Sequence, residues 1–449
     1  MRGWLRQTTG GLPKTFWLLW AGTLINRLGA FVIIFLAIYL TREMGFSQSR
    51  AGLVLGLYGA GGAVGTVVGG VLADRWGRRP TLLTAHLGAA TVMLSLGFAR
   101  DYWQLAGGAL LLGLFADGAR PAFSAMMVDI VGERDRLRAF SLNYWAINLG
   151  FACSAVIAGL VAELDFLLLF VIDAGTTLIT AAIVFFFLRE TRPARSDPAR
   201  SARGRRAGLG TVFRDRTFLG FVGLNLLIVM VIMQHLSTLP IAMSTDGLSA
   251  ATFGWVIAVN GVLIVAGQLF VPRLIEGRDR SRVLALACVI TGVGFGLTAF
   301  ADTAWLFAGT VVIWTLGEML QSPSNSTLIA ELSPAALRGR YQGVSSLSWA
   351  VASALAPIGG GYVQEHLGDP ALWLGCAGVG VLVAVGQLAS GPARERRIAA
   401  LKAAAPRSAD AAPVVAPVVA PALAPAAVEP GPTGVPDVGS ADRVQAPAR

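Results

Sequence analysis

Residues 70–79, which read G-V-L-A-D-R-W-G-R-R, decide how the rest of the chain is interpreted. A long apolar run precedes them and another follows directly, which predicts a tight, charged turn between two hydrophobic helices. Charged side chains are costly inside a bilayer, so the charges of this turn must lie at one membrane face. One interpretation is a hinge, in which Asp74 and Arg78 pair with neighbouring helix ends and Gly77 allows a turn that a Cβ would obstruct. The other is that the arginines only mark the loop as cytoplasmic.

The composition is that of a membrane protein. The chain has 449 residues, of which 55% are hydrophobic and 14% charged, with a mean hydropathy of +0.64. Soluble domains are about a quarter charged, and a spanning helix needs about 20 mostly apolar residues. Twelve such windows predict an all-α membrane protein with twelve transmembrane helices. The windows are 16–40, 51–73, 80–99, 103–128, 138–162, 166–188, 217–241, 250–272, 282–300, 304–329, 340–363 and 370–391.

The net charge of +10 is placed unevenly between the two predicted faces. In a soluble protein it would suggest nucleic acid or acidic lipid as a partner, but in a membrane chain we expect no nucleic acid. Lys and Arg gather on one face, and the positive-inside rule then places both termini in the cytoplasm. The opposite face carries Arg42, Arg50 and Arg100. The basic groups assigned to the cytoplasmic face are Arg2, Arg6, Lys14, residues 75–79, residues 134–138, the central loop and residues 394–402.

The sequence offers no signal of enzymatic or metal chemistry. Cys153, Cys288 and Cys376 all fall inside apolar windows, which argues against a disulfide framework or a zinc site. We find no nucleophile–base pair, phosphate-binding loop or metal-ligand spacing, so we expect no enzyme, cofactor or metal. The first apolar run is longer than a signal-peptide core and lacks an A-x-A site near its end, so we interpret it as a retained helix.

Composition also divides the chain into domains. Residues 189–216 are rich in Arg, Ser, Gly and Pro, too polar to span and too poor in apolar residues to fold alone. We interpret them as a flexible cytoplasmic linker, attracted to anionic lipid, between six-helix bundles at 1–188 and 217–392. Residues 393–449 turn basic and then into Ala, Pro and Val repeats, which predicts a disordered cytoplasmic tail.

An internal repeat supports the two bundles. Residues of the first half recur in the second at an offset of 202 (338 minus 136), with no gap. The same offset places Asp74 on Glu276 and Arg78 on Arg280, in a degenerate copy of the opening turn. Such a duplication predicts pseudo-symmetric halves related by an axis along the membrane normal. The matched residues are Pro121, Asp129, Arg136, Arg138, Gly159 and Glu163 in the first half and Pro323, Glu331, Arg338, Arg340, Gly361 and Glu365 in the second.

The opening turn matches a family signature, G-x-x-x-D-R-x-G-R-R. It resembles the loop between helices 2 and 3 of the major facilitator superfamily of twelve-helix secondary transporters. The likeness covers about residues 1–392 and is strongest in the drug:proton antiporter branch, through N-R-L-G-A-F in the first window, L-P-I-A-M after the seventh and R-G-R-Y-Q-G opening the eleventh. Two positions depart from that branch, because Ala155 stands where a Pro is usual in helix 5 and Leu114 where an Arg is usual in helix 4. The signature positions are Gly70, Asp74, Arg75, Gly77, Arg78 and Arg79.

The resemblance implies alternating access with a latch at the cytoplasmic face. Asp74 is expected to cap the start of helix 11, where the positive end of the helix dipole favours an anion. Arg78 would reach Asp129 at the end of helix 4, and these contacts would close the base of the outward-open state. The second half would repeat the cluster. The remaining latch candidates are Arg136, Arg138, Glu276, Arg280, Glu331 and Arg338.

In the resembled family, helices 1, 4, 7 and 10 line a central cavity. Their counterparts here carry polar residues, whereas helices 3, 6, 9 and 12 are plainer apart from Asp173. Asp117 and Arg120 share a helix face, where they neutralise each other or turn one charge toward the cavity. The candidates for substrate binding or proton coupling are Asn26, Arg27, Asp117, Arg120, Gln234, His235, Glu318, Gln321 and Asn325.

Coupling to protons needs a group whose proton affinity changes as water reaches it from one side or the other. Glu318 is the first candidate, because it lies mid-helix with no cation three or four residues away. Asp117 is second, since Arg120 would hold it ionised. His235, toward the outer end of helix 7, is third. The remaining alternative is that no proton is coupled.

We therefore expect a secondary transporter of a bacterial inner membrane that exports amphipathic small molecules or drugs in exchange for protons. Its partners would be the substrate, protons and the lipid bilayer, and we expect a monomer. One alternative is a symporter or facilitator for a polar or anionic metabolite, with Arg27 or Arg120 binding the anionic group. Another is a non-transporting membrane sensor or scaffold that uses the tail as its partner site.

Overall fold

The fold is helical throughout the part of the chain that the structure describes, which contains no strand. The predicted linker and tail fall mostly on residues 192–209 and 405–449, which lie outside the described residues. The computed structural model describes residues 11–132, 135–191, 210–268, 270–334 and 337–404.

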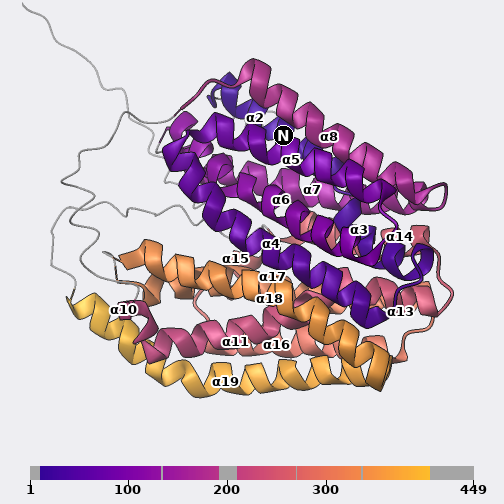
Figure 1. Ribbon diagram of the computed structural model, residues 1–449. Helices are drawn as coiled ribbons and strands as arrows, with labels where there is room; N and C mark the ends of the chain where they lie inside the picture. The colour runs from indigo at the N-terminus through magenta and orange to yellow at the C-terminus, as the bar shows by residue number, and fades with distance from the viewer. Residues whose placement is uncertain (1–10, 133–134, 192–209, 269, 335–336, 405–449) are drawn as a thin grey trace, which may run out of the picture.

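The first half consists of helices that run back and forth between the two ends of the molecule (Figure 1). Its first span is interrupted, because α2 (Lys14–Leu28) ends at Gly29 and α3 (Val32–Ile38) then continues into a π-helical turn, η1 (Tyr39–Glu43). The other spans are α4 (Gln48–Arg75), α5 (Arg78–Phe98), α6 (Tyr102–Ile130), α7 (Arg136–Ala162) and α8 (Phe166–Phe187).

The second half repeats this pattern. Its first span is also interrupted, since α11 (Arg216–Ile232) gives way to the short α12 (Gln234–Ser237) and α13 (Leu239–Thr245). A short helix, α10 (Gly210–Phe213), precedes it. The other elements are α14 (Ala250–Gly267), α15 (Val271–Ile275), α16 (Arg280–Leu297), η3 (Thr298–Phe300), α17 (Ala304–Leu332), α18 (Arg338–Leu367) and α19 (Asp369–Ala404).

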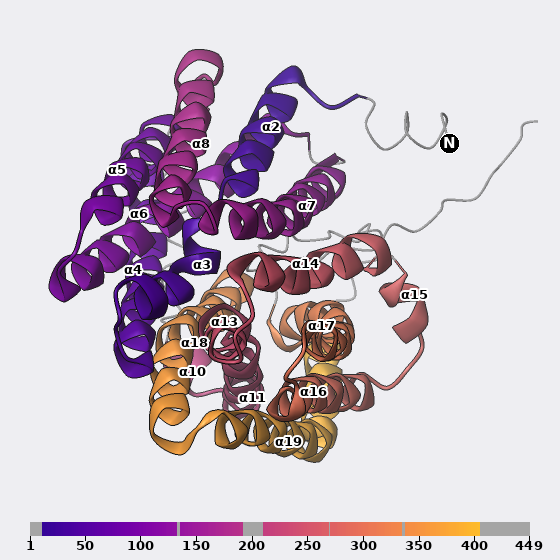
Figure 2. The same cartoon turned by 90° about the vertical axis from the view of Figure 1, so that its right-hand side faces the viewer.

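The two halves lie one above the other in Figure 1 and remain separate bundles when turned in Figure 2. The most extensive contacts between them are made by α4 with α18 and by α7 with α14, and α3 also contacts α12 and α13. The first two pairs are equivalent under the repeat, because α4 corresponds to α14 and α18 to α7. The halves therefore meet along two related seams.

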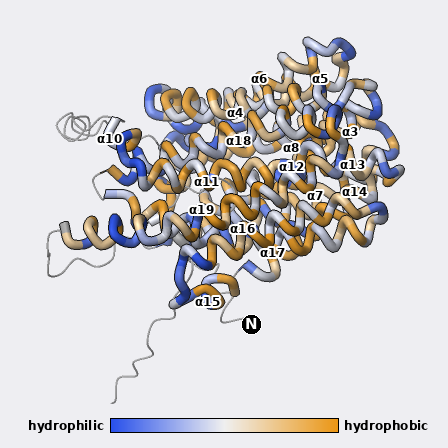
Figure 3. Tube along the Cα trace, turned by 90° about the horizontal axis from the view of Figure 1, so that it is seen from below, coloured by the Kyte–Doolittle hydropathy of each residue, from blue (hydrophilic) through white to orange (hydrophobic). Residues whose placement is uncertain are grey.

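The predicted twelve-helix fold is confirmed, since every predicted window coincides, to within a few residues, with a long helix or an interrupted helix of the structure. Ten helices of the described chain are long and apolar enough to cross a membrane. The other two windows form α6 and α18, which are 29 and 30 residues long but lack an equally apolar stretch. Figure 3 shows hydrophobic residues along the helices and hydrophilic ones gathered at the ends of the molecule.

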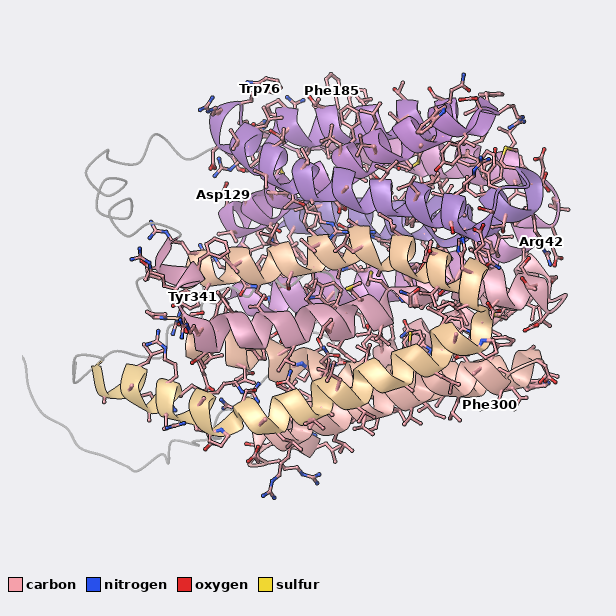
Figure 4. The ribbon with its side chains drawn as sticks, turned by 60° about the horizontal axis from the view of Figure 1, so that its bottom comes forward. Arg42, Trp76, Asp129, Phe185, Phe300 and Tyr341 are labelled. Atoms are coloured by element: carbon pink, nitrogen blue, oxygen red, sulfur yellow. The ribbon has the colours of Figure 1, made fainter. Side chains whose placement is uncertain are left out.

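The molecule has two distinct ends. The basic end, as we name it, holds the turn at 76–77, the starts of α7 and α18 and the last turns of α19. Figure 4 shows Trp76, Asp129 and Tyr341 toward this end and Arg42 and Phe300 at the opposite one, the far end.

Glycines allow the closest helix approach inside the first half. Gly61, Gly65 and Gly69 of α4 lie against the carbonyl groups of Leu110, Leu114 and Gly118 on α6, with no room for a Cβ. Small residues of this kind permit backbones to pack tightly in a bilayer. This spacing also places α6, and the charges that it carries, in a fixed position beside α4.

The predicted start of the tail, at 393, is too early, because α19 continues through Pro392 to Ala404. The Arg394 guanidinium is buried, donates a hydrogen bond to Ser281 Oγ at 2.9 Å and lies 5.6 Å from the ring centre of Phe221. Arg397 donates to Asp215 Oδ2 at 3.0 Å. These contacts with α16 and the start of α11 hold residues 393–404 against the second half.

Candidate functional site

A large cavity lies between the two halves. Its volume is about 3020 Å³, and its walls come from both bundles. Arg78 and Arg136 of the first half and Arg278 and Arg338 of the second line it at the basic end. The mouth of the cavity is therefore at the basic end.

The far end is closed by contacts between the halves. The Arg42 guanidinium donates to the carbonyl oxygens of Ser244 and Leu248, each at 3.0 Å. The rings of Phe35 and Phe253 pack edge to face with their centres 5.4 Å apart. The structure thus has an open basic end and a closed far end.

The signature turn joins the end of α4 to the start of α5. Gly77 has φ +116° and ψ 166°, a conformation that is essentially restricted to glycine. The Glu190 carboxylate accepts hydrogen bonds from the backbone N–H groups of Arg78 at 2.9 Å and Arg79 at 3.0 Å. Arg79 also donates to the Phe185 carbonyl at 2.6 Å. The carboxylate and Arg79 together tie the start of α5 to the end of α8.

Sequence reasoning missed Glu190. It follows the sixth apolar window directly and was included in the basic linker, so no pattern singled it out. A carboxylate beside a helix N-terminus is favoured by the helix dipole, but Glu190 lies 112 residues from Arg78 in the chain, so this preference could not identify it from the sequence.

The predicted ion pair between Arg78 and Asp129 is present, with Nε to Oδ2 at 3.1 Å. The Arg78 side chain is 12% exposed, and its second contact, with Asp74, is longer at 3.9 Å. The repeat-related residues Arg280 and Glu331 also form an ion pair. Each pair lies within its own half and joins the start of one helix to the end of another.

The predicted cap by Asp74 on helix 11, which is α18, is absent from this structure. The Asp74 side chain is 82% exposed, and α18 belongs to the other half across the cavity mouth. The expectation assumed a closed basic end, whereas this end is open. Glu276 and Arg338 line the mouth and form no ion pair among the described residues.

The remaining latch candidates have local roles. Gly70 faces Pro121 of α6, whose Cβ would lie 3.8 Å from a Cβ placed on the glycine. Arg75 is exposed at the end of α4. Arg138 pairs with Asp135 at 3.3 Å, in the turn before α7.

Glu318 lies in the wall of the cavity on α17, as predicted. It is 6% exposed, and its Oε2 accepts a hydrogen bond from Asn260 Nδ2 at 3.0 Å. The same Asn260 amide donates to Thr315 Oγ1 at 3.1 Å. No cation of the described chain lies within ion-pair distance of Glu318, so its charge has neutral polar partners.

The opposite wall carries two cations and two carboxylates. Arg120 pairs with Asp117 at 3.0 Å, as one of the two interpretations of their spacing expected, and both residues line the cavity. Arg27 lines the cavity and forms no ion pair in the described part of the chain. Asp173 accepts from the Val32 N–H at 3.1 Å and so caps the second part of the broken first span.

Not all predicted lining residues face the cavity. Asn26 lines it and donates to Thr177 at 3.0 Å, and His235 lines it with its ring tilted on Trp314. Gln234 instead donates to the Ala356 carbonyl of α18 at 3.1 Å. Gln321 donates to Asn225 at 3.4 Å, also inside the second half.

Asn325 is likewise not part of the cavity wall. Gln234, Gln321 and Asn325 share their helices with lining residues but lie on other faces. Only one face of a helical span points toward the cavity. The break after α11 changes which face of the following segment does so.

Comparison with known proteins agrees with this architecture. The family model described as Major Facilitator Superfamily matches residues 19–357 and 235–428. Multidrug resistance protein MdtH of Klebsiella pneumoniae (strain 342) is 28% identical over 370 residues, which cover 79% of this chain and 89% of the relative. The Uncharacterized MFS-type transporter YttB of Bacillus subtilis (strain 168) is 26% identical over 373 residues, covering 81% and 91%.

Solved structures share the fold at lower sequence identity. A POT family transporter in complex with 5-aminolevulinic acid superposes with a TM-score of 0.73 at 15% identity, covering 86% of this chain and 98% of that one. The nucleoside transporter NupG gives a TM-score of 0.72 at 16% identity, covering 84% and 100%. Since the family model matches most of the sequence, this chain belongs to the major facilitator superfamily and is a membrane transporter rather than an enzyme.

Proposed function

We propose that the chain is a proton-coupled exporter of amphipathic small molecules that works by alternating access. The observation that carries this proposal is the Glu318 carboxylate, which is buried in the cavity wall with Asn260 as its hydrogen-bond donor and no cation beside it. The proton affinity of such a group depends on whether water reaches it. A cavity that opens alternately to each side changes that hydration in every cycle.

The lining of the cavity suits an amphipathic cargo. Phe115 and Phe151 supply aromatic surface, and Asn26, Arg27 and Glu318 supply polar groups on opposing walls. Ligand pockets commonly combine apolar walls with a few polar groups that fix orientation. Export of several compounds agrees with the name of the MdtH relative, which is a multidrug resistance protein.

A second candidate function rests on Arg27. Its guanidinium faces the cavity without an ion pair in the described chain, and Arg120 lies on the same wall. A cation in this position favours cargo with an anionic group, which is the chemistry of a metabolite symporter or facilitator.

We also propose that the basic end faces the cytoplasm of a bacterial inner membrane, which agrees with the positive-inside rule. Both termini would then be cytoplasmic. The domain division would be two bundles joined by the linker, the first at 1–188 and the second from 217 to the end of α19 at 404. The cavity is complete within one chain, which supports a monomeric transport unit.

The test is flux in proteoliposomes under an imposed pH gradient, with one cationic, one neutral and one anionic amphiphile as cargo. Glu318→Gln should abolish gradient-driven flux while retaining exchange of cargo at equal pH, because binding and rocking remain. The control Asp302→Asn changes an exposed carboxylate at the far end and should behave as wild type. Unchanged gradient-driven flux in Glu318→Gln would refute the role of Glu318, and transport of the anionic cargo alone would favour the second function.

A further inference from the structure

Two carboxylates at the far end accept hydrogen bonds from the half of the molecule to which they do not belong. Glu163 follows the last residue of α7, and its Oε1 accepts a hydrogen bond from the backbone N–H of Ala251 at 3.3 Å. Glu365 lies in the last turn of α18, and its Oε2 accepts from the N–H of Ser49 at 2.7 Å. Neither residue belongs to the cavity or to the signature turn.

The two contacts are equivalent under the internal repeat. Glu163 and Glu365 are separated by the repeat offset of 202, and so are Ser49 and Ala251. In each case the residue whose N–H donates is the second residue of its helix, Ser49 in α4 and Ala251 in α14. The first backbone N–H groups of a helix have no partner within the helix, so a carboxylate there satisfies one of them. The positive end of the helix dipole also favours the negative charge.

The backbone beneath each carboxylate fixes this arrangement. A Cβ on Gly159 would lie 2.9 Å from the Ala250 carbonyl, and a Cβ on Gly361 would lie 2.5 Å from the Gln48 carbonyl. These glycines and their partners are again related by the repeat offset. Each helix end is therefore pressed against the start of a helix in the other half, with no room for side chains between them.

The contacts of Glu163 and Glu365 differ from the ion pairs at the basic end in the helices that they join. The ion pairs at the basic end join helices of one half, so they persist when the halves move apart. The contacts of Glu163 and Glu365 join different halves, so they must break when the far end opens. They are made in a structure whose basic end is open.

We propose that Glu163 and Glu365 form a two-part latch that holds the far end closed. Each carboxylate stabilises the state that is open at the basic end, and loss of either shifts the conformational equilibrium toward the state that is open at the far end. The proposal requires alternating access, but it requires neither proton coupling nor a particular cargo.

The test measures distances between spin labels at each end, in lipid nanodiscs without cargo or pH gradient. Leu164→Cys and Trp305→Cys place exposed labels on different halves at the far end, and Trp76→Cys and Leu274→Cys do so at the basic end. The background chain has alanine in place of Cys153, Cys288 and Cys376. Because the measurement needs no transport, its failure would leave the proposed export function untouched.

Glu163→Ala and Glu365→Ala should each raise the ratio of open to closed far-end distances about threefold, as expected for an exposed charge at a helix N-terminus. The double variant should raise it about tenfold, with a matching shortening at the basic end. The control Asp101→Ala removes a carboxylate cap that lies within the first half, on α6, and should leave the ratio unchanged.

A double variant with wild-type distances, or a control with the same shift, would overturn the latch. Glu163→Gln and Glu365→Gln provide a second set in case the alanine variants do not fold. They keep an acceptor oxygen and remove the charge, so a smaller shift in the same direction is expected. No shift in the glutamine pair together with misfolding of the alanine pair would assign these residues to folding and would also refute the latch.

Discussion

Replacing Gly77 with alanine should loosen the start of α5. Gly77 has φ +116° and ψ 166°, and a residue with a Cβ pays about 1–3 kcal/mol to adopt such a conformation. A Cβ there would also lie 2.5 Å from Glu190 Oε2, so the carboxylate must move. Its hydrogen bonds to the N–H groups of Arg78 and Arg79 would then weaken. Glu190 is exposed, so we assign about 1 kcal/mol to that loss.

The two effects add to about 2–4 kcal/mol of local opening free energy, and 1.4 kcal/mol corresponds to a factor of ten. Hydrogen exchange of the amides of Arg78 and Arg79 should therefore accelerate at least about 30-fold in Gly77→Ala. Mass spectrometry of a peptide that spans the turn reports this exchange directly. Peptides from α17 and α18 provide an internal reference, because the change lies in the other half.

Gly175→Ala is the matched control, since a Cβ on Gly175 of α8 has no atom within 4 Å. Glu190→Gln keeps the acceptor oxygen but loses the charge, and it should give a smaller acceleration than Gly77→Ala. If Gly77→Ala exchanges no faster than Gly175→Ala, the turn does not depend on glycine and the reasoning is refuted.

Two further pairs of variants test charged contacts in both halves. Arg78→Ala should slow transport about tenfold and Arg280→Ala about threefold, because the Arg78 side chain is 12% exposed and that of Arg280 is 45% exposed. Initial rates normalised to protein amount measure this, and the reverse order would contradict it. Gly62→Ala places a Cβ against the Asp117 carboxylate and should lower transport by disturbing the pair with Arg120, whereas Gly107→Ala, which has open space, should not. Equal rates in the two variants would show that the Asp117–Arg120 geometry does not matter.

Hydropathy and the internal duplication can both be read directly along the sequence, and for this reason the sequence predicted the architecture well. Each apolar window corresponds to a helix, and the offset of 202 carries the Arg78–Asp129 pair onto Arg280–Glu331. The resemblance implied the first of these pairs, and the repeat alone then placed Arg280 beside Glu331. Gly77 could also be predicted, because a turn between two long helices leaves few conformations for residues with a Cβ.

The site was harder to predict because it depends on the conformational state and on helix rotation. Asp74 would cap α18 only in a state whose basic end is closed. The same sequence serves both states, so it does not indicate which one a structure adopts. Gln234 lies beyond the point where α11 ends, so its direction could not be read from helical periodicity. The burial of Arg394 depends on contacts with Ser281 and Phe221, which are far away in the chain.

The distribution of contacts separates two kinds of mutation in this fold. Ion pairs at the basic end connect helices of the same half, so their loss should weaken a half without favouring either mouth. The carboxylates at the far end connect different halves, so their loss should favour one mouth without weakening a half. Arg42 belongs to the second kind, since it bonds carbonyl groups of the other half, but it has no repeated counterpart because Ser244 occupies the equivalent position. Beside the two repeat-related contacts of Glu163 and Glu365, the far end thus has in Arg42 a contact between the halves that lies outside the duplication.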